Sequence, residues 1–292
     1  MKHWKIFIHC HNAIFPEMYA NDPDFSAEHY TFLRLGQHSL DCPAGKDYQV
    51  ISERDFPHHW DDPNYAELTG LYCVYRNGLY NSLDYVGFSH YDKEHRLLSA
   101  SASFDIDKLE KARYTHEVAR KPSKTPTDVT ARISNIIAAH SQVHISLESH
   151  KFEKIYRQRV LMDPVHPNRF VGDGPNCIDR ILADYNEYYN THYTLADVAR
   201  DGFLNMCNCF VTPVELFEKL MKFITPIMES RRLEIFDTGR KHRLQGGLLE
   251  RYVAVFFALE NIPKVDLSLL HQYWRKKTAK RRPSILRFWR RA

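Results

Sequence analysis

The chain has 292 residues, of which 43% are apolar and 26% are charged, and its formal net charge is +4. This composition predicts a globular protein built on one large domain, and no apolar run approaches the roughly 18 residues of a membrane-spanning helix. The N-terminal sequence MKHWKIFIHCHN lacks the apolar length and the cleavage site of a secretory signal. We therefore expect a cytoplasmic protein with reduced cysteines.

Positive charge is concentrated at the C-terminus. Residues 271–292 contain nine Lys or Arg and no Asp or Glu, whereas residues 1–270 carry 31 basic and 36 acidic residues, a net charge of −5. An acidic body with a basic tail is not the pattern of a nucleic-acid-binding protein whose whole face is positive, so we expect no nucleic-acid partner. A nucleic-acid-binding alternative depends on the tail alone.

Aromatic and apolar residues are interleaved with the charges of this tail. They are Tyr273, Trp274, Ile285, Leu286, Phe288 and Trp289. Trp and Tyr favour the headgroup level of a bilayer, and Lys and Arg are attracted to anionic lipid. The pattern predicts that residues 271–292 are a membrane-association segment, distinct from a domain formed by residues 1–270.

The first predicted strand covers residues 5–11 and ends in His9, Cys10 and His11. Neighbouring residues on a strand point to opposite faces, so these three side chains cannot all bind one metal ion. His9 is instead interpreted as the wall of a ligand pocket at the strand end. Residues 12–60 show no sustained periodicity and predict loops, with one short element near residues 30–35.

Residues 61–95 form the stretch around which the rest of the chain is organised. Asp62 and Pro63 predict a helix start, and Asn77-Gly78 predicts its end. Apolar residues at spacings of three and four give this helix one buried face, formed by Tyr65, Leu68, Tyr72 and Tyr75. The next predicted strand, residues 85–88, runs into the polar sequence SHYDKEH. A buried strand with such an end marks the ligand site of an open α/β sheet.

The remainder of the chain alternates between helical and strand patterns. We expect helices at residues 105–120, 128–140, 178–193, 213–225 and 244–259, strands at 143–148 and 204–210, and a loop at 160–176. The elements together predict an α/β fold.

Three blocks of this sequence resemble the bacterial capsule and O-antigen glycosyltransferases. The first block of that family reads N-x-x-Y-x-E-L-T-x-x-Y-W-x-W-K-N and then D-Y-x-G-x-x-H-Y-R-R. Its matches here are Tyr65, Glu67, Leu68, Thr69, Tyr72, Asn77, Asp84, Tyr85, Gly87, His90 and Tyr91. The N-M-F-I-M block is matched by Asn205-Met206, and R-x-x-G-F-L-x-E-R by Arg243, Gly246, Leu248, Glu250 and Arg251. Cys73 and Tyr75 replace the tryptophans, and Asp92-Lys93 replaces the Arg-Arg pair.

The resemblance implies a GT-A-like mixed sheet flanked by helices, with a helical C-terminal part and the basic tail. Residues 1–270 would be the glycosyltransferase domain, working on the inner face of the cell membrane. It would take a nucleotide-sugar donor and a glycan or lipid-linked glycan acceptor. The implied substrate-binding residues are Glu67, Thr69, His90, Tyr91, Asn205, Arg243 and Gly246. Two further candidates come from the residues themselves: His9 from its place at a strand end, and Lys93 because it can supply a cation to phosphate.

Glycosyl transfer requires that the leaving diphosphate be neutralised and that the acceptor hydroxyl lose its proton. His90 and Asp92 share a face if the strand continues, and an imidazole with a carboxylate suits Mn²⁺ better than Mg²⁺. A surface His–Asp pair is the alternative for these two residues. The family has Arg at the position of Asp92, which implies that the fold can neutralise the diphosphate without metal. Catalytic candidates are Asp92 for the leaving group, with Asp173, Asp237 and Glu250 as bases. The alternative role of Glu250 is a structural salt bridge to Arg251.

The alternative for the whole chain is that it is a catalytically inactive scaffold of polysaccharide assembly.

Overall fold

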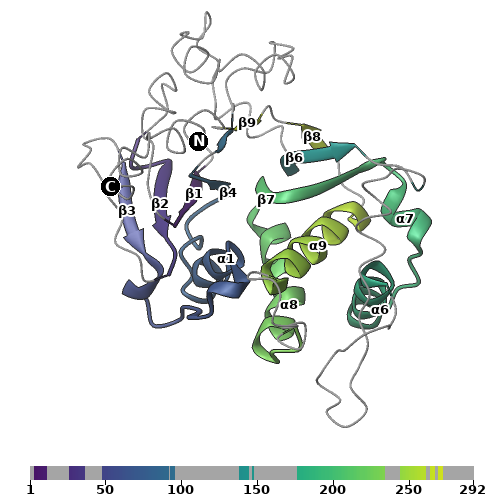
Figure 1. Cartoon of the computed structure of the whole chain (residues 1–292). Helices are drawn as coiled ribbons and strands as arrows, with labels where there is room; N and C mark the ends of the chain where they lie inside the picture. Colours follow the sequence, from purple (N-terminus) through teal and green to yellow (C-terminus); the bar gives the residue numbers. More distant parts are fainter. Residues whose placement is uncertain are drawn as a thin grey trace, which may run out of the picture.

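The computed structural model describes the sheet and the helices that cover it (Figure 1). The described residues are 3–11, 26–36, 48–91, 93–95, 138–144, 147, 176–233, 244–260, 264–266 and 269–271. No helix among them is long and apolar enough to cross a membrane.

In the described residues, seven strands form the central sheet in the order β3-β2-β1-β4-β7-β6-β8. Their bounds are β1 Trp4–Cys10, β2 Tyr30–Arg34, β3 Gln49–Ser52, β4 Tyr85–His90, β6 Ala138–His144, β7 Phe203–Pro213 and β8 Lys264–Asp266. Strands β1 to β4 are parallel, β7 is antiparallel to both β4 and β6, and β8 is parallel to β6. A separate sheet pairs β5 (Lys93–His95) with β9 (Leu269–His271).

The chain reverses its direction of travel across the sheet at β1. From β1 it proceeds to β2 and β3 on one side, and it then returns to place β4 on the other side of β1. In open α/β sheets, ligands bind outside the carboxyl ends of the two strands at such a switch point. The topology therefore places a candidate site where β1 and β4 end.

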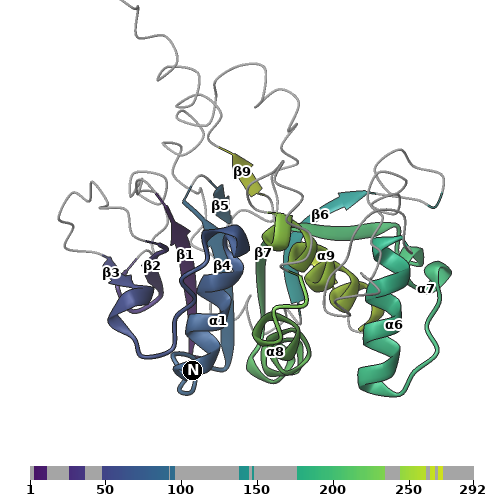
Figure 2. The same ribbon diagram turned by 60° about the horizontal axis from the view of Figure 1, so that its bottom comes forward.

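Helices α1 (Leu68–Arg76), α8 (Val214–Glu229) and α9 (Leu244–Leu259) lie together against one face of the sheet (Figures 1 and 2). Beside α9 are α6 (Cys177–Tyr189) and the short α7 (Leu195–Ala199). Short 3₁₀ turns, η2 (Glu53–Asp55) and η3 (Pro63–Tyr65), precede α1. Because α9 packs on β7, α6, α7 and α8, almost its whole surface is buried, which explains its apolar sequence.

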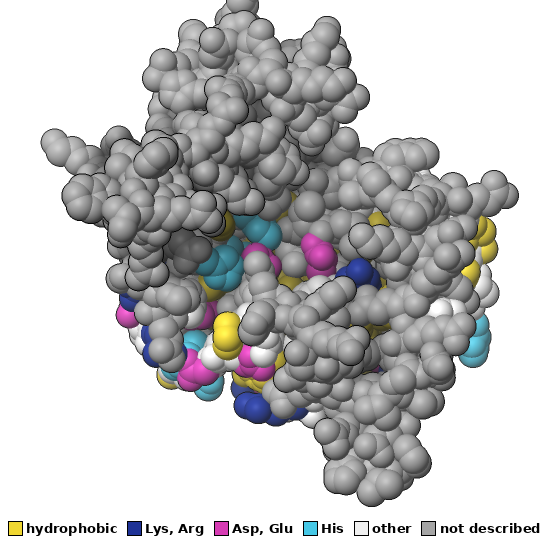
Figure 3. Space-filling model, viewed as in Figure 1, with side chains coloured by type: hydrophobic (Ala, Val, Ile, Leu, Met, Phe, Trp, Pro, Cys, Tyr) yellow, Lys and Arg dark blue, Asp and Glu magenta, His cyan; other side chains and the backbone are white. Residues whose placement is uncertain are grey.

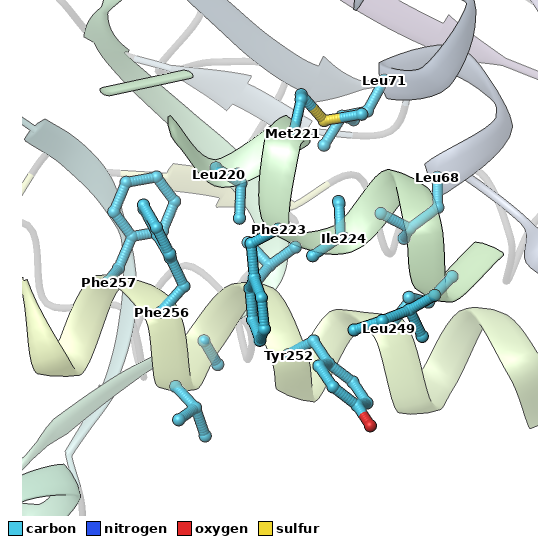
Figure 4. Close-up of a cluster of buried hydrophobic side chains, with 14 of the residues drawn as sticks. Leu68, Leu71, Leu220, Met221, Phe223, Ile224, Leu249, Tyr252, Phe256 and Phe257 are labelled. Carbon is cyan, nitrogen blue, oxygen red and sulfur yellow. The ribbon is translucent and has the colours of Figure 1, made fainter. Parts of the chain in front are cut away.

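The core lies where α1, α8 and α9 meet (Figure 4). It is filled by Leu68 and Leu71 of α1, by Leu220, Met221, Phe223 and Ile224 of α8, and by Leu249, Tyr252, Phe256 and Phe257 of α9. Apolar positions three and four apart on each helix converge there, so the periodicity of the sequence is the direct cause of this packing.

Most of the predicted elements are confirmed. The strands expected at residues 5–11, 85–88 and 204–210 correspond to β1, β4 and β7, and the short element near residues 30–35 is β2. The helices expected at 178–193, 213–225 and 244–259 are α6, α8 and α9. The expected helix at 105–120, the start of the one at 128–140 and most of the loop at 160–176 lie outside the described residues.

Three expectations were wrong. The helix expected from Asp62 to Asn77 is interrupted at Ala66, whose φ of 52° separates the Asp62-capped turn η3 from α1. Residues 12–60 are not all loop, since β3 extends the parallel sheet and η2 follows it. Residues 138–140 were assigned to a helix but begin β6, because pairing with β7 outweighs the helix propensity of Ala138 and Ala139.

Candidate functional site

The candidate site lies at the carboxyl ends of β1 and β4. The two strands pair in parallel with His9 opposite His90, so both strands end at the same edge of the sheet. The backbone N–H of Tyr91 donates to the carbonyl of His9 at 2.9 Å, which extends the contact one residue beyond β4. His9, next to the last residue of β1, and His90, the last residue of β4, are thereby fixed side by side.

Glu67 connects the two strand ends. Its Oε1 lies 3.4 Å from Nε2 of His11 and 3.5 Å from Nδ1 of His90. The exposed fractions of the side chains are 13% for Glu67, 12% for His90 and 27% for His11, so the group is only partly open to solvent. Figure 3 shows histidine and acidic side chains gathered next to one another in the hollowed middle of this face.

The backbone around Glu67 explains its position. Ala66 has a positive φ of 52° with a ψ of −130°, and Glu67 then occupies the N-cap position of α1 without capping the helix through its side chain. The Thr69 hydroxyl donates to the Ala66 carbonyl at 3.0 Å. The turn before α1 therefore directs the Glu67 carboxylate away from its own helix and toward the strand ends.

His9 lies beneath this group as an uncharged ring. It is fully buried, and burial lowers the pKa of its imidazole to about 3, with a further lowering from His90. Within the described part of the chain, neither ring nitrogen has a hydrogen-bond partner. The ring packs against Gly70, where a Cβ would lie 2.4 Å from Nε2 of His9, so only glycine fits at this point of α1.

Glu53 is a buried acid that sequence reasoning did not identify. Its carboxylate accepts a hydrogen bond from the Gly36 N–H at 2.6 Å, and its backbone carbonyl accepts one from the Cys73 thiol of α1 at 3.8 Å. Burial raises the pKa of its carboxyl group, and the hydrogen bond from Gly36 partly opposes the rise. Glu53 thus joins the loop after β2 to α1.

Gly246 brings α9 close to the site. A Cβ at this position would lie 2.8 Å from the Cβ of Ala66 and 2.9 Å from the carbonyl oxygen of Tyr65. The absence of a side chain allows α9 to approach the turn that precedes Glu67. The structure therefore gives Gly246, expected as a substrate-binding residue, a clear packing role.

The other expected residues have different positions. Asn205 is buried in β7, and because β7 is antiparallel to β4, residues before Phe210 lie toward the carboxyl end of β4. Glu250 is half-buried on α9, and the guanidinium of Arg251 donates to the carbonyl of Gly247. The backbone of Lys93 begins β5. Asp92, Asp173, Asp237 and Arg243 lie outside the described residues.

The structure brings together His9, Glu67, His90 and Tyr91, as expected, and adds His11. The parity of the strand was the signal for His11, because His9 and His11 are two residues apart and share a face. Among the described side chains, no group of three or more His, Cys, Asp or Glu is arranged to hold a metal ion. Glu67 and His90 do supply the carboxylate and imidazole donors that suit Mn²⁺.

Comparison with known proteins gives a family and a fold. A family model described as a domain of unknown function, DUF4422, matches residues 60–261. No curated protein matches the chain. The apo structure of the bifunctional glycosyltransferase WbbM superposes with a TM-score of 0.59 and 14% identity, covering 91% of this chain and 45% of WbbM. The chain thus spans less than half of WbbM.

A second solved structure is the GDP complex of the S. cerevisiae mannosyltransferase Ktr4p. It has a TM-score of 0.33 and 10% identity, covering 91% of this chain and 71% of Ktr4p. The likeness to WbbM confirms the expected GT-A-like fold, a mixed α/β sheet flanked by helices.

Proposed function

Because the chain belongs to the DUF4422 family and has a glycosyltransferase fold, we propose that it transfers a sugar from a nucleotide-sugar donor to a glycan or lipid-linked glycan acceptor of a surface polysaccharide. The observation that carries the proposal is the group formed by Glu67, His11 and His90 at the switch point between β1 and β4. Open α/β sheets bind nucleotides outside the carboxyl ends of the strands at such a switch point.

The chemistry of the site has two parts. The donor diphosphate would lie outside the ends of β1 and β4, with His90 and Asp92 or Glu67 holding Mn²⁺ or Mg²⁺. Such an ion neutralises the charge that develops on the leaving diphosphate. Asp173 and Glu250 are the proposed bases for the acceptor hydroxyl, and Asn205 and Arg243 are proposed to bind the donor. The position of Asn205 toward the carboxyl end of β4 supports its proposed role in donor binding.

The C-terminal segment supports a location at the membrane. Strand β9 ends at His271, which pairs with Lys93 of β5 just after the candidate site. Residues 272–292, with their nine Lys or Arg, therefore follow on from a point beside the site. We propose that they bind anionic lipid on the inner face of the membrane, which would bring the site close to a lipid-linked acceptor.

The donor is tested by measuring hydrolysis and binding for a panel of nucleotide sugars, with Mn²⁺, with Mg²⁺ and without metal. We expect at least one donor to bind and to be hydrolysed slowly. Glu67→Gln should lower the turnover of that donor about a hundredfold, since it removes the charge facing both imidazoles. Glu215→Gln, on the exposed side of α8, is the matched control and should retain wild-type turnover.

The membrane part is tested separately by sedimentation with anionic and with neutral vesicles. A chain ending at His271 keeps β9 and lacks the basic segment. We expect the full chain, and not the shortened chain, to pellet with anionic vesicles, and we expect pelleting to decrease as salt is added.

The donor panel also tests the alternative function. If no nucleotide sugar is bound or hydrolysed, the result favours an inactive scaffold.

A further inference from the structure

Strands β5 and β9 join segments that lie far apart in the sequence. They pair antiparallel, with Lys93 opposite His271, Glu94 opposite Leu270 and His95 opposite Leu269. Figure 2 shows the two strands side by side next to the end of β4. The C-terminal part of the chain is thereby attached to the strand that directly follows the candidate site.

The position of β5 gives this pairing its importance. Only two residues separate His90 at the end of β4 from Lys93 at the start of β5. The first of them, Tyr91, donates its N–H to the carbonyl of His9. In the described residues, β9 is the strand that pairs with β5. The direction of the chain on leaving the site therefore depends on β9.

We propose that β9 is a positioning element of the candidate site. By holding β5, it keeps His90 and Tyr91 in place against Glu67 and His9. Two three-residue strands are marginal as an isolated pair, so small changes in β9 are sufficient to release β5. A displacement of about 1 Å in a site can reduce a reaction about a hundredfold. The expected loss of donor affinity rests on the proposed function.

The test compares two variants of the full chain. Leu269→Pro/Leu270→Pro removes two successive N–H groups, and Leu269→Ala/Leu270→Ala keeps both. Successive N–H groups of a strand point in opposite directions, so the N–H of one of these two residues faces β5. Both variants shorten the same leucine side chains. A difference between them therefore reports the backbone pairing.

Two measurements are made on each variant. Amide hydrogen exchange of Tyr91 and of residues 93–95 should accelerate at least tenfold in the proline variant and little in the alanine variant. Donor affinity should fall about tenfold or more in the proline variant only. The melting temperature of both variants should stay close to that of the wild type, because β5 and β9 lie outside the main sheet.

The outcomes separate this inference from the proposed function. Unchanged exchange at Tyr91 in the proline variant overturns the inference, and so does a donor affinity equal to that of the alanine variant. If the wild-type chain binds no nucleotide sugar, the proposed function fails, while the exchange of Tyr91 still decides whether β9 positions the site.

Discussion

Two parts of the molecule hold certain buried polar groups in different ways: the helical half, formed by α6 to α9, and the site half, formed by β1 to β4 and α1. In the helical half, the buried Asp184 of α6 accepts hydrogen bonds from Arg180, from Arg232 and from the hydroxyl of Tyr252 on α9. Burial still raises the pKa of the Asp184 carboxyl group, so desolvation outweighs its partners. The carboxylate joins α6, α9 and the segment after α8.

A second buried acid of the helical half has partners of the same kinds. Glu260, just after α9, accepts from the Tyr185 hydroxyl at 2.8 Å and from Nζ of Lys219 at 2.7 Å. Burial, and then the hydrogen bond to Glu260, raises the pKa of Tyr185. Each buried acid in this half thus has a cation and a tyrosine as partners.

The site half contains a buried group that is treated differently. His9 has no hydrogen-bond partner in the described part of the chain and is held by shape, between Gly70 and Phe88. Burial keeps it neutral, with a pKa of about 3. The difference teaches that paired charges join the helices through their buried acids, whereas the ring beneath the Glu67 group is uncharged and is held by close packing.

The largest expected effect is the removal of the acid that joins the helices. Asp184→Ala should lower the free energy of unfolding by about 3 kcal/mol, because two guanidinium groups and a buried hydroxyl lose their partner. Urea denaturation measures the loss. Glu187→Ala, an exposed acid on the same helix, is the control and should change stability by less than about 0.5 kcal/mol.

The activity of the folded fraction sharpens this comparison. Asp184 lies in the helical half, so the turnover per folded molecule should be unchanged in Asp184→Ala. A variant that keeps its stability but loses turnover would place Asp184 with the site and would contradict the division into two halves.

The second prediction uses neighbouring glycines of α9. Gly246→Ala should destabilise the protein by about 1–3 kcal/mol, because the new Cβ would lie 2.8 Å from Ala66 and force α9 away from the turn before Glu67. Gly247→Ala meets no atom closer than 3.6 Å and should stabilise the helix by about 0.5–1 kcal/mol. Thermal unfolding of the two variants should therefore shift in opposite directions.

The same pair of variants tests the link between α9 and the site. Gly246→Ala should also reduce donor turnover, since the turn that directs Glu67 is displaced, whereas Gly247→Ala should leave turnover unchanged. Equal stability of the two variants would show that α9 can move away from Ala66 without cost.

Much of the fold could be predicted from the sequence because its strongest signals are local. Strands β1, β4 and β7 are short segments of mostly apolar residues, and α8 and α9 have helical periodicity. The break at Ala66 could not be predicted, since alanine is not a residue that marks a positive φ. The first part of β6 was missed because its pairing with β7 is a tertiary effect that a local Ala-rich sequence does not report. The strand expected at residues 143–148 overlaps β6 only at residues 143 and 144, where β6 ends.

The site could be predicted in part for a similar reason. The polar ends of β1 and β4 indicated His9 and His90, and the resemblance indicated Glu67. The contact of Glu67 with His11 and the close approach of Gly246 to Ala66 both depend on how α1 and α9 pack against other elements. Spacing along the chain carries no direct information on such contacts.

The smallest expected effect is the pH dependence caused by His9. An unfolded histidine has a pKa of about 6.5, whereas the folded value is about 3, so between these values the unfolded chain binds a proton that the folded chain does not. Stability from this source is complete above pH 6.5 and falls as the pH is lowered, by about 1.4 kcal/mol at pH 5.5. His9→Gln should abolish that part of the decline, while His192→Gln, an exposed histidine between α6 and α7, should retain it. Urea denaturation at pH 7.5, 6.5 and 5.5 measures the three chains. A His9→Gln variant that loses stability as steeply as the wild type would mean that the buried imidazole can take up a proton in the folded state, and packing alone would then not account for how His9 is held between Gly70 and Phe88.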